Sequence, residues 1–251
     1  MKYATALLGA ASLALAGSFV ARAEVFSQPA IVEPVNDEAI AQGMPRLLSH
    51  FRFFRDASAQ VPVDRVTPYR LNTPLFSDGA EKLRFVYLPE GTAMAAQGEG
   101  LPEFPVGTAL IKTFAFEQDG QRRLIETRVL LHRADGWLAL PYMWNEEQTD
   151  ARLAVAGARL DLTTPKGEAI SYRIPNKNQC KECHGLDGEV VPIGPKARNL
   201  SHDWLSEMVS AGHLDTLPQD ADQFPVWEQR ESANLTAAAR AYLDVNCAHC
   251  H

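Results

Sequence analysis

The spacing of hydrophobic and polar residues has the two-residue period of β-strands through the middle of the chain. In KLRFVYL (82–88), for example, Leu83, Phe85 and Tyr87 fall on one face of a strand. Similar patterns, separated by turn-forming residues, predict strands over 104–117, 122–133, 136–144, 151–164 and 168–174. We therefore predict that residues 60–175 form an antiparallel meander, arranged as a β-sandwich or an open barrel.

Apolar residues with helical spacing occur on both sides of this β domain. PRLLSHFRFF (45–54) predicts a short helix within an N-terminal leader, residues 24–59. SHDWLSEMVSAG (201–212) predicts a helix with Ser201 as its N-cap and Gly212 just beyond its end. LTAAARAYLDVN (235–246) predicts another helix, capped by Asn234. The predicted fold class is α+β, with the β domain followed by a small, mostly α-helical region.

The first 23 residues have the features of a secretory signal peptide. Lys2 precedes a long apolar stretch, and Ala21-Arg22-Ala23 is a small-x-small cleavage site. An uncleaved membrane anchor is the alternative, but the apolar stretch is interrupted by Gly and Ser and is short for a membrane span. We expect Sec-dependent export to a Gram-negative-type periplasm, cleavage before Glu24 and no transmembrane segment in the mature protein.

The charge of the chain limits its partners. It has 24 basic and 31 acidic side chains, and loss of Lys2 and Arg22 with the signal peptide changes the net charge from −7 to about −9. Such a charge argues against binding to nucleic acid or anionic membrane surfaces. It suits docking to basic protein partners in the periplasm.

All four cysteines occur in two CxxCH units, Cys180–His184 and Cys247–His251. This spacing attaches a c-type haem, because two thiols reach its vinyl groups and the adjacent His reaches the iron. We therefore predict two haem c cofactors, bound by Cys180, Cys183, Cys247 and Cys250, with His184 and His251 as proximal iron ligands. The alternatives are structural disulfides, a redox disulfide and a zinc site made by the two pairs. The two His residues favour haem.

The remaining ligands are less defined by the sequence. Met208 and His213 are candidate distal ligands of the first haem, although Met208 also fits the apolar stripe of its helix and His213 also fits a surface position. We expect His249, inside the second motif, to face solvent. No nucleophile–base pair, phosphate loop or carboxylate pair indicates a catalytic centre.

Several long stretches resemble a poorly characterised family of exported bacterial dihaem c-type cytochromes, from about Pro68 to the last residue. They are PYRLNTPLFSDGAEKLRFVYLPEG (68–91), FPVGTALIKTFAF (104–116), ETRVLLHRADGWLALPYMWNEEQTDARLAVAGARLDL (126–162), IPNKNQCKECHG (174–185), PIGPKARNL (192–200) and YLDVNCAHCH (242–251). The resemblance implies a periplasmic redox protein with an N-terminal β domain and supports both haem motifs. Members of the family continue past the second motif, where this chain stops. We therefore expect residues 176–230 to form a cytochrome c-like region for the first haem. Residues 231–251 are expected to be the start of a second, truncated cytochrome c domain.

Three functions fit these observations. The leading hypothesis is single-electron transfer between periplasmic partners through covalently bound haem. A haem-dependent oxidoreductase of peroxidase type requires one iron with an open coordination position. The third hypothesis treats the β domain as a ligand-binding module with attached redox haems.

Overall fold

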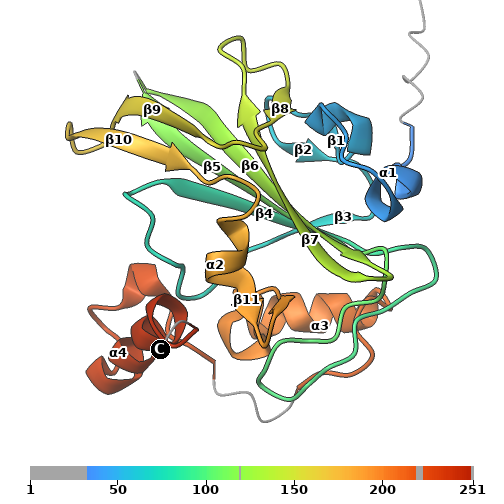
Figure 1. Ribbon diagram of the computed structural model, residues 1–251. Helices are drawn as coiled ribbons and strands as arrows, with labels where there is room; N and C mark the ends of the chain where they lie inside the picture. Colours follow the sequence, from blue (N-terminus) through green and yellow to red (C-terminus); the bar gives the residue numbers. More distant parts are fainter. Residues whose placement is uncertain (1–32, 119, 219–222, 250–251) are drawn as a thin grey trace, which may run out of the picture. The chain divides into compact units, whose positions relative to one another are not determined.

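The computed structural model describes residues 33–118, 120–218 and 223–249 (Figure 1). The expected signal peptide, residues 1–23, lies outside the described residues, as do Cys250 and His251 of the second motif. Predictions about these residues therefore stay predictions.

A six-stranded antiparallel sheet forms the centre of the fold (Figure 1). Its strands follow one another in sequence order, as predicted for a meander: β3 (Val66–Tyr69), β4 (Glu81–Tyr87), β5 (Ala109–Gln118), β6 (Gln121–Arg133), β7 (Gly136–Trp144) and β8 (Ala151–Leu153). Two-residue loops join β5 to β6 and β6 to β7, where Gln118 pairs with Gln121 and Arg133 with Gly136. The α+β fold class with antiparallel sheets is confirmed.

Three predicted elements differ from the structure. The strand expected over 151–164 is divided, because Gly157, with φ +72°, ends a turn after β8. The second half, β9 (Ala158–Thr163), pairs with β10 (Ala169–Ile174) in a separate two-stranded sheet. The strand expected from 104 begins at Ala109, since Gly107 with φ +94° belongs to a preceding turn.

The predicted helix over 45–54 is also wrong in type and length. Only a 3₁₀ turn, η1 (Leu48–Phe51), forms there, because Arg52 adopts a left-handed conformation with φ +58°. The chain then continues into β1 (Phe54–Asp56), which pairs with β2 (Val61–Pro62). The N-terminal segment instead contains a short helix, α1 (Asp37–Ala41).

The two faces of the central sheet contact different parts of the chain. Phe85, Ile111 and Val129 belong to a buried cluster formed with the N-terminal segment. Val86, Leu110 and Leu130 belong to a second cluster, formed with the segments that follow β10. The alternation predicted for β4 is therefore observed, and both faces of the central strands are covered.

The region after β10 contains short elements around the first CxxCH unit. The two longer helices are α3 (His202–Ser210) and α4 (Leu235–Asn246), and both predicted N-caps are confirmed. Ser201 accepts a hydrogen bond from the Trp204 amide at 3.2 Å, and Asn234 accepts one from the Ala237 amide at 3.1 Å. The others are α2 (Cys180–His184), β11 (Gly185–Leu186), β12 (Glu189–Val190), η2 (Ala197–Asn199) and η3 (Trp227–Gln229). In the part of the chain that the structure describes, no helix has the length and apolarity needed to cross a membrane.

Gly157 fixes the position of the segment that leads to the first CxxCH unit. A Cβ atom at Gly157 would lie 2.6 Å from the Ile174 carbonyl oxygen and 2.8 Å from the Asn176 amide nitrogen. We expect Gly157→Ala to destabilise the protein by about 3 kcal/mol, because backbone strain and a backbone clash add together.

Gly167→Ala is the matched control, since Gly167 has φ +83° but an added Cβ would meet no atom within 4 Å. It should cost only about 1–2 kcal/mol, the price of a left-handed alanine. Urea unfolding of both variants measures the difference. Equal destabilisation would show that residues 174–176 are not held by this contact.

Candidate functional site

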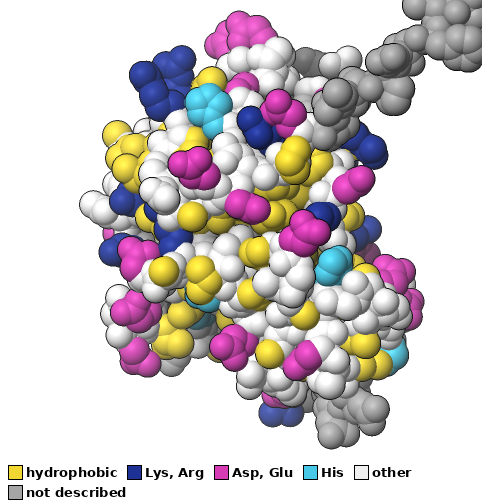
Figure 2. Space-filling model, turned by 90° about the vertical axis from the view of Figure 1, so that its right-hand side faces the viewer, with side chains coloured by type: hydrophobic (Ala, Val, Ile, Leu, Met, Phe, Trp, Pro, Cys, Tyr) yellow, Lys and Arg dark blue, Asp and Glu magenta, His cyan; other side chains and the backbone are white. Residues whose placement is uncertain are grey.

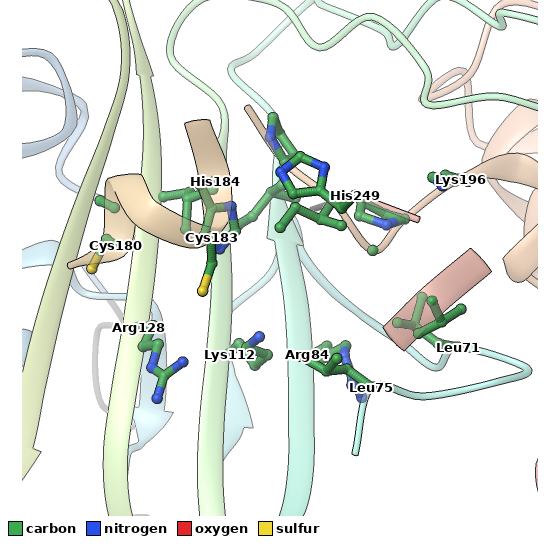
Figure 3. Close-up of a pocket in the computed structure, with 18 of the residues that line it drawn as sticks. Leu71, Leu75, Arg84, Lys112, Arg128, Cys180, Cys183, His184, Lys196 and His249 are labelled. Atoms are coloured by element: carbon green, nitrogen blue, oxygen red, sulfur yellow. The ribbon is translucent and has the colours of Figure 1, made fainter. Parts of the chain in front are cut away.

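The first CxxCH unit forms a single helical turn, α2, that residues 175–179 connect to β10. Asn176 and Gln179 start it through reciprocal hydrogen bonds, in which each side-chain oxygen accepts from the other residue's amide, at 2.9 and 3.0 Å. Residues three apart lie on the same side of a helix, so Cys180 and Cys183 project together. Figure 3 shows both sulfur atoms directed towards basic side chains on the neighbouring strands.

A tight hairpin orients the His184 imidazole. Asp187 and Gly188 have φ values of +51° and +87°, as a two-residue type I′ turn requires, and they connect β11 to β12. The hairpin returns the chain to His184, whose Nδ1 is 2.8 Å from the Val191 carbonyl oxygen. A carbonyl only accepts, so Nδ1 carries the proton and Nε2 keeps a lone pair for a ligand.

The surroundings of this unit keep the His184 imidazole and the Cys180 thiol neutral. Burial is the main cause that lowers the pKa of His184 to about 4, with smaller effects from the positive charges of Lys112 and Arg128. Burial also raises the pKa of the Cys180 thiol, which is only 7% exposed. At neutral pH, His184 is therefore an uncharged imidazole and Cys180 a protonated thiol.

A cavity of about 370 Å³ is lined by the first CxxCH unit and by described residues of the second. Cys180, Cys183 and His184 line it on one side, and Cys247 and His249 line it from the end of α4. Its volume is within the range of about 300–1,000 Å³ that is usual for small-molecule and cofactor sites. The first unit and the described part of the second are far apart in sequence, but they therefore line a common cavity.

Three polar contacts hold the end of α4 at this cavity. Asp244 accepts hydrogen bonds from Lys196 at 2.7 Å and from Arg198 at 2.6 Å. Asn246 accepts one from the Phe76 amide at 2.9 Å. These contacts fix the segment that carries Cys247 and His249.

The prediction that His249 faces solvent is wrong for its Nε2 atom. This atom is buried and has no hydrogen-bond partner among the described residues. His249 also contributes to the lowered pKa of His184, so the two imidazoles are close enough to interact electrostatically. A buried, unpartnered nitrogen is costly unless something binds it, and here it belongs to a residue that lines the cavity.

A row of basic side chains on the central sheet forms another wall of the cavity. Arg84 on β4, Lys112 on β5 and Arg128 on β6 are directly paired in register across the three strands (Figure 3). All three line the cavity. Sequence analysis missed these residues, although single basic residues within otherwise apolar strands are a recognisable signal.

Comparisons with protein-family models, curated proteins and solved structures found no match to this chain.

The two residues predicted as candidate distal ligands, Met208 and His213, lie outside this cavity. Met208 is buried in α3 and packs in the cluster that contains Leu205 and Leu214. His213 follows α3, and its carbonyl accepts a hydrogen bond from the Met94 amide at 2.9 Å. Neither residue lines the cavity, so the structure does not bring them together with His184.

The described cysteines are all free, and the described residues contain no group of three or more His, Cys, Asp or Glu side chains that could hold a metal ion. The donors that line the cavity are of a different kind. They comprise two thiols on one helical turn, a neutral imidazole beside them and a second imidazole nitrogen without a partner.

Proposed function

We propose that this protein is a periplasmic c-type cytochrome that transfers single electrons through haem covalently bound at Cys180 and Cys183. The single observation that carries the proposal is the arrangement of α2. Both thiols project to the same cavity, and the adjacent His184 has its Nδ1 engaged by Val191, which leaves Nε2 for iron. When bound, haem would supply one-electron redox chemistry, and the protein holds and orients it.

The raised pKa of Cys180 weighs against a redox disulfide at this site. Reactive CxxC motifs depend on a thiol whose pKa is lowered by positive charge or by a helix N-terminus. At Cys180, burial outweighs the nearby positive charge of Arg128, so the thiol stays protonated. A buried thiol beside a neutral imidazole suits thioether formation with a haem vinyl group better than disulfide exchange.

His249 distinguishes electron transfer from peroxidase-type chemistry. An iron with two protein ligands is closed to substrates, whereas an open position permits reaction with peroxide. The buried Nε2 of His249 is a second nitrogen without a partner among the described residues, and His249 lines the same cavity as His184. We therefore propose His249 as the distal ligand of the first haem, which favours electron transfer. Cys247, Cys250 and His251 would attach the second haem.

Intact-mass spectrometry of the periplasmic protein tests the central claim. The protein should be produced with the signal peptide and a c-type haem attachment system. We expect two haem masses added to the polypeptide, the spectrum of a c-type cytochrome and reversible one-electron reduction. A mature polypeptide without any haem mass would overturn the proposal, and rapid turnover of peroxide by the holoprotein would favour the oxidoreductase alternative.

The partners are proposed only by class. Acidic side chains are spread over the face shown in Figure 2 rather than gathered in one patch. The negative net charge of the chain suits transient docking to basic redox proteins, and this distribution marks out no single acidic docking patch on that face.

A further inference from the structure

We propose that Arg84 and Lys112 form a site for two carboxylates, which the propionates of the haem at Cys180 and Cys183 occupy. This inference rests on the proposed function and adds the residues that hold the far edge of the cofactor. Arg84, Lys112 and Arg128 are here called the cation row. Three independent features of this row lead to the inference: like charges lie opposite one another, two of the three residues lack a carboxylate partner in the described part of the chain, and the row runs away from the two thiols.

The register places like charges against one another. Arg84 is directly opposite Lys112, and Lys112 is directly opposite Arg128. Like charges at directly opposed positions of antiparallel strands destabilise the sheet. An arrangement of three such residues on adjacent strands therefore points to an anion that offsets the repulsion.

Only one end of the row is neutralised by the protein. Arg128 forms an ion pair with the fully buried Glu126, which also accepts a hydrogen bond from Tyr172 at 2.6 Å. Arg84 is 8% exposed, and its hydrogen bond goes to the neutral Lys82 carbonyl. Within the described ranges, neither Arg84 nor Lys112 has a carboxylate partner.

Burial makes the two unpaired cations unfavourable as they stand. Burial is the main cause of the lowered pKa of Arg84. It is also the main cause that lowers the pKa of Lys112 well below its ordinary value. The other basic residues at the cavity differ, since Lys196 is paired with Asp244 and Arg173 is exposed. Among the described residues, two basic side chains without a carboxylate partner thus remain at the cavity, which matches the two carboxylates of one haem.

The row also runs in the required direction. Arg128 is the member whose charge acts on Cys180, and Arg84 is two strands further away, a distance of roughly 10 Å between backbones. Figure 3 shows the same order from the cysteines across the strands to Arg84. In haem, the vinyl groups that bond to cysteine and the propionates are at opposite edges. A haem held at Cys180 and Cys183 that extends along the row therefore brings its propionates to Lys112 and Arg84.

The test measures the reduction potential of the holoprotein as a function of pH, for the natural protein and for R84M/K112M. With both cations present, the propionates stay ionised, and we expect a potential that varies little from mildly acidic to neutral pH. Without the cations, the propionate pKa rises and reduction takes up a proton. The potential of the variant should then fall as pH rises. Lys112→Met alone, for use if the double variant does not accumulate, should give a smaller slope of the same sign.

R122M/R123M is the matched control, because it removes two positive charges from exposed positions at the far end of β6. It should keep the natural pH profile. A fully haem-loaded R84M/K112M with the natural profile would overturn the inference. Succinate that binds the natural holoprotein but not R84M/K112M would also overturn it, since a free dicarboxylate would then occupy the site. Absence of haem from the natural protein would instead contradict the proposed function, so the two failures are distinguishable.

Discussion

Replacing Cys180 and Cys183 by Ala is expected to remove one of two haem masses and to leave the central sheet folded. Both thioether bonds to the first haem are lost, and the remaining imidazole ligands hold haem only reversibly. The sheet should persist because its core against the N-terminal segment, which includes Phe85, Ile111 and Val129, contains neither cysteine. Intact mass and the visible spectrum measure the haem, and far-ultraviolet circular dichroism measures the sheet.

C247A/C250A provides the matched control for this experiment. It should lose the other haem mass and keep the first, because its cysteines belong to the second motif. A C180A/C183A protein that still carries two haem masses would contradict attachment at α2. Loss of both masses, with normal circular dichroism, would mean that the two attachments are not independent.

The elements that could be predicted from sequence depend on local interactions. The strands β4, β6 and β7 follow from hydrophobic alternation, and the N-caps Ser201 and Asn234 follow from side chains that bond to nearby amides. The division of the 151–164 strand was missed although Gly157, whose positive φ forms the turn, is a local signal, whereas the contact that this turn makes with a distant segment has no such signal. Gly157 closely approaches the backbone of Ile174 to Asn176, and the sequence around Gly157 does not reveal this approach.

The same distinction applies to the candidate site. The roles expected for Cys180, Cys183 and His184 come from a contiguous motif, and the Asp187-Gly188 turn that orients His184 is also a local signal. The cation row depends on strand register, which aligns residues 84, 112 and 128 only after β4, β5 and β6 have paired. The position of His249 depends on the ion pairs that Asp244 forms with distant basic residues.

His249→Ala is expected to change the first haem from a low-spin to a high-spin state. The physical reason is the loss of the proposed distal nitrogen, which opens one coordination position of the iron. Electron paramagnetic resonance and the visible spectrum of the oxidised holoprotein measure the change. The signal of the first haem is the one that C180A/C183A lacks. Added imidazole should restore the low-spin signal of His249→Ala, which a loss of folding would not allow.

His213→Ala and Met208→Leu are the controls, since they remove the two ligands that the sequence suggests. Neither residue lines the cavity, so both variants should keep the natural low-spin signal. Met208→Leu retains an apolar side chain of similar size in the core, and its effect on stability should be below about 1.5 kcal/mol. If the first haem stays low-spin in His249→Ala but becomes high-spin in His213→Ala or in Met208→Leu, the distal ligand is the residue replaced in the high-spin variant and not His249. A natural protein that is already high-spin at the first haem would leave its iron open and favour peroxidase-type chemistry over electron transfer.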